Sequence, residues 1–190
     1  MDNRMKQSQK SVLSYLRDLT LLLAIVMVVF LLFTRIVVVS GPSMMSTLID
    51  GDYLLVVGKP FYNTPKAGDI IVVSKDSFKN GEPIIKRVIA TEGQTVEIRG
   101  NNLYVDGIYQ DEDYAFTLTS APIGDYYSTT VADGCIFVMG DNRAVSKDSR
   151  SNDIGQIDCR EVLGKAVFVI LPGVNEITNS RDFERFGVIS

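Results

Sequence analysis

Three short segments of this sequence bring together side chains that could carry out nucleophilic chemistry. In the first, residues 40–48, Ser43 follows a Gly-Pro bend. In the second, residues 84–89, Lys86 interrupts an apolar run, and the third, residues 140–150, is densely polar. The chain contains no histidine, which excludes Ser-His-Asp and Cys-His catalytic groups and metal sites with histidine ligands. Acid–base chemistry in this chain therefore has to use Lys, Asp, Glu or Tyr.

Ser43 and Lys86 are a candidate nucleophile and base. Strand alternation places Lys86 and Arg87 on opposite faces. If Lys86 faces the interior, burial disfavours its charged form and lowers its pKa, and a neutral amine can accept the serine proton as in a Ser-Lys dyad. Two plainer interpretations stay open here: Ser43 is only a turn-forming residue, and Lys86 and Arg87 lie on an edge strand with both charges in water.

The elements that must position these side chains begin with an apolar run over residues 19–39. Only Thr20, Thr34 and Arg35 in these 21 residues are not apolar, and a helix of this length reaches roughly 30 Å, enough to cross a bilayer. An uncleaved transmembrane anchor is the preferred interpretation, because the run is long for a signal peptide and residues 36–40 lack paired small residues for cleavage. A cleaved signal peptide and a buried core helix are the alternatives.

Charge on either side of the apolar run predicts its orientation. Four basic residues precede it: Arg4, Lys6, Lys10 and Arg17. The first basic residue well beyond it is Lys59. Because basic residues favour the cytoplasmic side, residues 1–18 are predicted to be a cytoplasmic tail and residues 40–190 an extracytoplasmic domain. The net charge of −4 is concentrated in that outer part, so the sequence predicts no nucleic-acid partner.

Beyond residue 40 the sequence predicts a mainly β fold. Short runs rich in Val, Ile and Tyr are separated by Gly, Asn, Asp or Pro. The predicted strands are residues 53–57, 70–73, 84–90, 95–99, 103–105, 136–139 and 166–170. Turn residues predict a small meander over residues 95–109, whereas residues 110–133 show no clear pattern and are taken as a loop that could contain a strand.

Two cysteines, Cys135 and Cys159, lie in the predicted outer part. They could form a disulfide in an oxidising compartment, or they could be two partly buried thiols, and both interpretations stay open. Their separation matches no metal-binding spacing, so no metal site is predicted.

With the three polar segments in this order, the chain resembles the bacterial type I signal peptidases of the small single-anchor form. Residues 41–48 and 51–52 resemble the family's nucleophile segment, and residues 86–88 resemble its lysine segment. Residues 140–150 fit the family signature Gly-Asp-Asn-Arg-x-x-Ser-x-Asp-Ser-Arg in full. The resemblance implies a mainly β catalytic domain preceded by one transmembrane helix, with a small β extension at about residues 91–133.

The resemblance also implies that a peptide bond is cleaved through an acyl-enzyme. Ser43 would be the nucleophile and Lys86 the general base. The oxyanion would be bound by the N–H groups of Ser43 and Gly41, because position 41, where some relatives have a serine hydroxyl, is glycine in this chain. No cofactor is implied.

Three residues of the polar segment and one departure complete the implied site. Ser146 would orient the lysine amine, and Asp148 and Arg150 would brace the loop that carries it. Ser46 stands where the family commonly has proline. The loop therefore loses a residue with a fixed φ, and we expect activity to be kept and loop stability to be altered.

The implied substrates are exported preproteins with small residues, typically Ala-x-Ala, before the cleaved bond, bound by strand addition. The implied location is the lipid bilayer, in a single pass, near the secretion translocon. Two alternatives remain: a membrane-tethered β module without catalysis, and a self-cleaving Ser-Lys regulator, which would need a scissile site in its own chain and a cytoplasmic DNA-binding region. Sortase-type chemistry needs Cys and His together and is excluded.

Overall fold

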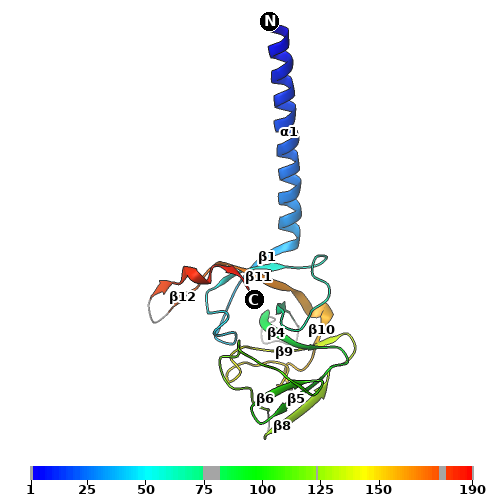
Figure 1. Cartoon of the computed structure of the whole chain (residues 1–190), viewed down its shortest axis with the longest axis vertical. Coiled ribbons are helices and arrows are strands. Elements are labelled where there is room, and N and C mark those ends of the chain that lie inside the picture. Colours follow the sequence, from blue (N-terminus) through cyan, green and yellow to red (C-terminus); the bar gives the residue numbers. More distant parts are fainter. Residues whose placement is uncertain (1, 75–81, 123, 176–178, 190) are drawn as a thin grey trace. The chain divides into compact units, whose positions relative to one another are not determined.

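The computed structural model describes residues 2–74, 82–122, 124–175 and 179–189, with side chains from residue 12 onward. The side chains of Arg4, Lys6 and Lys10, on which the predicted orientation depends, lie outside the described residues. The chain forms two compact units, residues 1–34 and 35–190. Figure 1 labels their elements.

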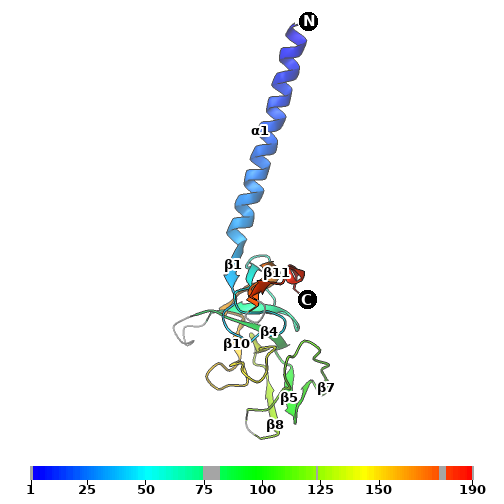
Figure 2. The ribbon, with the colours of Figure 1, turned by 90° about the vertical axis from the view of Figure 1, so that its left-hand side faces the viewer.

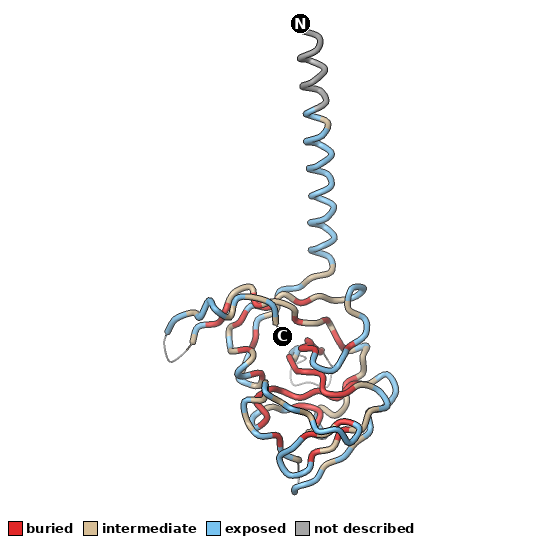
Figure 3. Tube along the Cα trace, in the orientation of Figure 1, coloured by how far each residue is buried: buried red, intermediate tan, exposed pale blue. Residues whose placement is uncertain are grey.

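The first unit is the continuous helix α1 (Asp2–Phe33). Its segment Val12–Phe33, 22 residues long, has the length and apolar composition needed to cross a membrane, and its most apolar part is not buried against the rest of the protein (Figure 3). An apolar helix with exposed side chains on all faces fits a lipid environment better than a soluble core.

The helix ends earlier than the sequence predicts. Residues 34–38, which the predicted anchor includes, form the strand β1 (Thr34–Val38) and pair with β2 (Tyr53–Val57). Most of these residues are β-branched, which favours an extended backbone, and the Thr34 hydroxyl donates to the Phe30 carbonyl at 2.8 Å, satisfying a carbonyl of the last turn. The predicted helix boundary at residue 39 is therefore corrected to Phe33.

The second unit is built on a sheet of eight strands, which confirms the mainly β prediction. Their order is β1-β2-β11-β3-β4-β9-β10, and β14 pairs with β11. The strands not yet given are β3 (Ile70–Val73), β4 (Ile84–Thr91), β9 (Cys135–Met139), β10 (Ile157–Asp158), β11 (Val162–Leu171) and β14 (Gly187–Val188). The order puts β4, the strand with Lys86, between β3 and β9 and away from both edges.

A smaller antiparallel sheet has the order β7-β6-β5-β8 (Figure 2). Its strands are β5 (Thr95–Arg99), β6 (Asn102–Val105), β7 (Ile108–Tyr109) and β8 (Tyr126–Thr130). The first three form the predicted meander, with Gly100 and Gly107 at positive φ in its turns. β8 lies in the segment that the sequence analysis takes as a loop that could contain a strand. The sequence does not predict β8 clearly, because its alternating exposed and half-buried Tyr, Ser and Thr residues give only a weak apolar pattern. A further short ladder joins β12 (Val174–Asn175) and β13 (Ser180–Arg181).

Core side chains cover both faces of the large sheet, and Figure 3 colours the buried residues of this unit red. Every residue of β3 is buried: Ile70 and Val72 pack in one cluster, and Ile71 and Val73 in another on the opposite face. A third cluster joins β9 to the smaller sheet. Because β3 is packed on both faces, it and the neighbouring β4 hold the residues of the three polar segments in fixed positions.

Neither cysteine is bridged in the structure. Cys135 begins β9, and Cys159 follows β10, its partner strand. Alternation puts Cys135 against the cluster that reaches the smaller sheet and Cys159 against the opposite cluster. Of the two interpretations, the structure has the partly buried thiols.

Candidate active site

The central strand β4 carries two cations into the interior. Lys86 and Arg87 are 4% and 3% exposed, and they pair with Ile71 and Ile70 of β3. The interpretation of an exposed edge strand is therefore wrong. Because successive residues of a strand face opposite sides, Lys86 points to one face of the sheet and Arg87 to the other.

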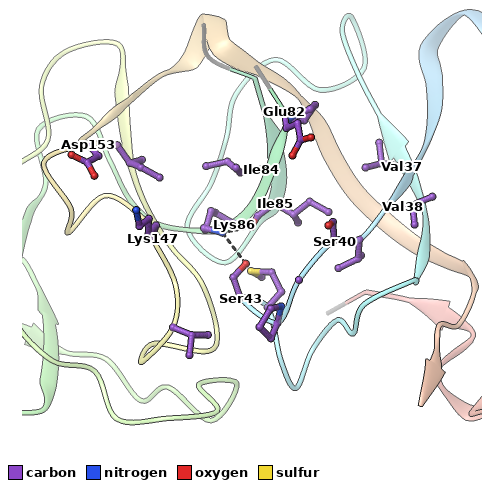
Figure 4. A pocket seen from close by; sticks show the side chains of 17 residues that line it. Val37, Val38, Ser40, Ser43, Glu82, Ile84, Ile85, Lys86, Lys147 and Asp153 are labelled. Carbon is purple, nitrogen blue, oxygen red and sulfur yellow. Dashed lines mark hydrogen bonds between the residues drawn. The ribbon is translucent and has the colours of Figure 1, made fainter. Parts of the chain in front are cut away.

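Lys86 reaches the serine that the sequence predicts as its partner. Its Nζ lies 2.9 Å from the Ser43 Oγ and 3.0 Å from the carbonyl oxygen of Ile85. Figure 4 shows the two side chains pointing toward each other across the cleft. This distance is within the range for transfer of a proton between the hydroxyl and a neutral amine.

The environment of Lys86 favours the neutral amine. Burial lowers its pKa from 10.5 to about 8, and the charges of Asp148 and Asp141 oppose this shift only in part. Among the ion pairs of the described residues, none includes Lys86. A direct carboxylate partner would hold the amine in its charged form, so its absence from this part of the chain keeps the amine able to act as a base.

The loop that carries Ser43 is anchored in the core on either side of the hydroxyl. Met44 and Leu48 are buried against the β2–β11–β3 side of the sheet, and the Leu48 N–H donates to the Met44 carbonyl in a turn. Gly41 takes a φ of +87° before Pro42, a conformation that side chains disfavour. The loop thereby leaves Ser43 half-buried at the wall of a cleft.

The two backbone donors predicted for an oxyanion differ in the structure. The Gly41 N–H donates to the Asp50 Oδ1 at 2.7 Å and is already engaged. No hydrogen bond between described residues uses the Ser43 N–H. The Ser43 N–H is thus the available donor, and Gly41 could serve only after exchanging its carboxylate partner.

Ser146 lies beside the nucleophile loop and makes no hydrogen bond to the lysine. Its Oγ is buried and has no hydrogen-bond partner among the described residues. A Cβ added at Gly140 would come within 2.3 Å of this Oγ and 2.4 Å of the Ser43 carbonyl oxygen. Gly140 therefore allows the close approach of the two segments, but the predicted bond between Ser146 and Lys86 is not formed.

Asp148 and Arg150 hold the same loop closed. The Arg150 Nε and Nη2 each lie 2.9 Å from one oxygen of Asp148, and this buried carboxylate also accepts from the Gly140 N–H at 3.1 Å. The Arg150 Nη2 donates to the Arg143 carbonyl at 2.7 Å as well. These contacts fix the two ends of the polar segment against each other.

A second buried ion pair, which the sequence reasoning did not single out, joins all three polar segments. The Arg87 Nε and Nη2 donate to the two oxygens of Asp141, each at 2.9 Å. The Thr47 hydroxyl donates to the same carboxylate at 2.5 Å. The Asn142 N–H adds a bond to the Ser43 carbonyl at 3.0 Å. The only signals available in the sequence were the alternation of Lys86 with Arg87 and the dense polar segment itself.

Ser43 and Lys86 line a cleft of about 720 Å³ (Figure 4). Its walls come from residues 37–44 and 82–86 and from the polar segment and the loop after it. Most of the lining residues are apolar, and besides Lys86 the lining has three ionisable side chains: Glu82, Lys147 and Asp153. The Ser43 hydroxyl and the Lys86 amine are therefore accessible from this largely apolar cleft.

The chain is similar to proteins of one peptidase family. The family model "Signal peptidase, peptidase S26" matches residues 12–171. The chain is 39% identical to Signal peptidase I of Bacillus licheniformis over 147 residues, which cover 73% of this chain and 77% of that protein. It is 31% identical to Signal peptidase IB of Staphylococcus aureus (strain COL) over 181 residues, 86% of this chain and 92% of that protein. The crystal structure of a signal peptidase I from Enterococcus faecalis V583 aligns with 55% of this chain and 97% of its own, at 30% identity and a TM-score of 0.46.

Proposed function

The chain belongs to the signal peptidase I family (peptidase S26) and is a membrane-anchored peptidase that removes signal peptides from preproteins, and we propose that Ser43 and Lys86 carry out this reaction as nucleophile and general base. The observation that carries the proposal is the 2.9 Å approach of a buried amine to a half-buried hydroxyl inside a cleft. In a chain without histidine, this pair supplies the activated nucleophile that peptide hydrolysis needs.

The reaction proceeds in two stages. The Ser43 Oγ attacks the scissile carbonyl carbon while its proton passes to the neutral Lys86 Nζ. The resulting ammonium gives this proton to the leaving amine as the C–N bond breaks, and the signal peptide stays on Ser43 as an ester. The amine, neutral again, then takes a proton from water, which attacks the ester carbon. The ammonium returns this proton to the Ser43 Oγ as the ester C–O bond breaks, and the signal peptide leaves as a carboxylic acid.

The negative oxygen of the tetrahedral intermediate accepts from the Ser43 N–H. Gly41 is the second donor, its N–H turning from Asp50 to the substrate oxygen. Removing one such donor from a serine peptidase typically costs about 10²- to 10³-fold in kcat, so the engagement of Gly41 by Asp50 bears directly on the rate.

The Ser146 hydroxyl, which has no hydrogen-bond partner among the described residues, is the proposed acceptor for Lys86 in its charged state. Once Lys86 has accepted the proton, its ammonium has a further donor to satisfy, and Ser146 is a buried acceptor on the adjoining segment. We propose that Ser146 orients the Lys86 amine through this hydrogen bond. Asp148 and Arg150 keep this segment in place through their ion pair.

Preproteins with small residues at the first and third positions before the cut fit this cleft. The edge strand β1 pairs with β2 on one side only, and its residues 37–38 line the cleft. An extended signal peptide can add to such an edge, with alternate side chains entering the apolar lining. Small residues of the Ala-x-Ala type let the peptide backbone lie close to these walls and to Ser43.

The proposed topology has residues 1–18 in the cytoplasm and the β domain outside, near the secretion translocon. Residues 1–39 carry five basic and two acidic side chains, which favours retention of the N-terminus. The anchor confines enzyme and membrane-bound signal peptide to one plane and raises their effective concentration.

Cleavage of a preprotein with altered residues before the cut tests this function. With detergent-solubilised full chain and an Ala-x-Ala preprotein, mass spectrometry should find one new N-terminus directly after the second Ala. Replacing either Ala with Leu should lower the rate by about 100-fold or more, because the added bulk should hold the scissile bond away from the Ser43 Oγ. Leu at the middle position, whose side chain points away, serves as the control. Cleavage that is indifferent to both Ala positions would rule out the proposed substrate.

A further inference from the structure

A buried carboxylate ties the end of the nucleophile loop to the last part of the chain. Asp52 is 0% exposed. Its Oδ2 accepts from the Ile49 N–H at 2.9 Å, within the loop, and its Oδ1 accepts from the Gly173 N–H at 2.7 Å, just after β11. Gly173 packs so closely there that an added Cβ would come within 2.1 Å of the Asp50 carbonyl oxygen. The turn at residues 50–52 is therefore seated on the end of β11.

The counter-ion of Asp52 comes from the short 3-10 helix η3 (Phe183–Arg185). Arg185 places its Nη1 3.1 Å from Oδ1 and its Nη2 2.8 Å from Oδ2 of the carboxylate. The same Nη2 donates to the Thr47 carbonyl at 3.0 Å. The Arg185 side chain is 20% exposed and Asp52 fully buried, so water screens the pair only weakly. A planar guanidinium is suited to this combined contact, whereas an ammonium is a point donor.

These contacts hold Thr47 from two sides. Arg185 binds its carbonyl, and Asp141 accepts from its hydroxyl at 2.5 Å. Thr47 lies four residues after Ser43 in the same loop, and residues 43–52 contain no proline that would fix a φ. The loop's conformation consequently depends more on contacts from outside it.

We propose that Arg185 is a positioning residue for the peptidase reaction: through the Thr47 carbonyl and Asp52 it holds the loop so that Ser43 stays within reach of Lys86. This inference rests on the proposed function of that pair. Arg185 touches no reacting atom and does not line the cleft. Its loss should consequently act on the rate of bond breaking, and KM should change little.

The test uses the full chain in detergent with one preprotein and the variants Arg185→Gln and Arg185→Lys. Arg185→Gln should lower kcat about 10- to 100-fold with KM within about twofold of wild type, since small displacements of a nucleophile have effects of this size. Arg185→Lys should keep the wild-type unfolding temperature, because its charge can pair with Asp52. It should still lower kcat, because one ammonium does not reproduce the fork that also holds the Thr47 carbonyl. Arg160→Gln is the matched control: Arg160 also lies in a 3-10 helix, η2 (Cys159–Glu161), and pairs with Asp158, but its side chain is 88% exposed.

Several outcomes would overturn the inference. Wild-type kcat in folded Arg185→Gln would overturn it, and so would full recovery of kcat in Arg185→Lys. A rise in KM alone would also overturn it, as would a loss of kcat that the unfolded fraction explains. If Arg185→Gln does not fold, Arg185→Lys decides by its kcat. Failure here is distinct from failure of the proposed function: wild-type kcat in Arg185→Gln beside an inert Ser43→Ala variant would remove only the role of Arg185.

Discussion

Replacing Lys86 with methionine should abolish preprotein cleavage and, at the same time, make the domain more stable. The Lys86→Met variant keeps the length and apolar stem of the side chain but removes the amine that accepts the Ser43 proton. Loss of a general base paired with its nucleophile should lower kcat by about 10³-fold or more. The fold should not suffer, because the amine is buried on the central strand β4 without an ion-pair partner among the described residues.

The stability gain follows from the pKa of the amine. Burial lowers this pKa from 10.5 to about 8, so near pH 7 the folded domain holds a buried charge that the unfolded chain holds in water. Removing it should raise the free energy of unfolding by an amount on the order of 3 kcal/mol at most. The wild-type domain should itself become more stable as pH rises from about 8 to 10.5, since the unfolded chain then binds a proton that the folded chain has lost, and the variant should lack this rise.

Thermal unfolding in detergent and a cleavage assay check both halves of this prediction. Lys66→Met is the matched control, because Lys66 is exposed and its loss should change neither quantity. Cleavage at the wild-type rate by Lys86→Met would exclude Lys86 as the base. A variant that unfolds at a lower temperature than wild type near pH 7 would mean that the lysine is not held at a cost.

The Ser43→Ala variant should lose cleavage by roughly 10⁴-fold or more, because no other group can form the ester intermediate. Preprotein binding should be unchanged within about twofold, since the hydroxyl is a small part of a cleft with many lining residues. Acid quenching of wild-type enzyme during turnover should trap the signal peptide on Ser43, found by mass spectrometry, and the variant should show no such adduct.

Ser128→Ala serves as the control for this variant, because Ser128 is an exposed residue of β8 in the smaller sheet. A Ser43→Ala variant that still cleaves would assign the reaction to another nucleophile. An inert wild-type chain, tested on several preproteins, would instead support the membrane-tethered module without catalysis.

Local patterns in the sequence carried much of the fold and the central pair of the site. The long apolar run predicts a membrane-spanning helix because of its length and composition, and alternation within residues 84–89 predicts opposite directions for Lys86 and Arg87. The end of the helix at Phe33 was missed, because Ile36, Val37 and Val38 continue the apolar run past Thr34 and Arg35. The strand differs from the helix chiefly in β-branching and in its partner strand β2.

The contacts that fix the site could not be predicted from the sequence, for a different reason. The bonds from Arg185 to Thr47 and Asp52 join parts of the chain 138 and 133 positions apart, and no short-range pattern encodes them. The same holds for Asp141, which meets Arg87 only because β9 is the neighbour of β4. The capture of the Gly41 N–H by Asp50 depends on the path of one loop. Residue types therefore indicate the chemistry, whereas pairing across the sheet decides which groups support it.

The pH dependence of kcat/KM for preprotein cleavage tests most directly whether an uncharged Lys86 activates Ser43. This quantity reports the ionisations of the free enzyme. With the pKa of Lys86 lowered to about 8, kcat/KM should rise about tenfold per pH unit below that value and level off above it. A flat profile between about pH 6 and 9, or a rise centred near the ordinary lysine value of 10.5, would contradict the account.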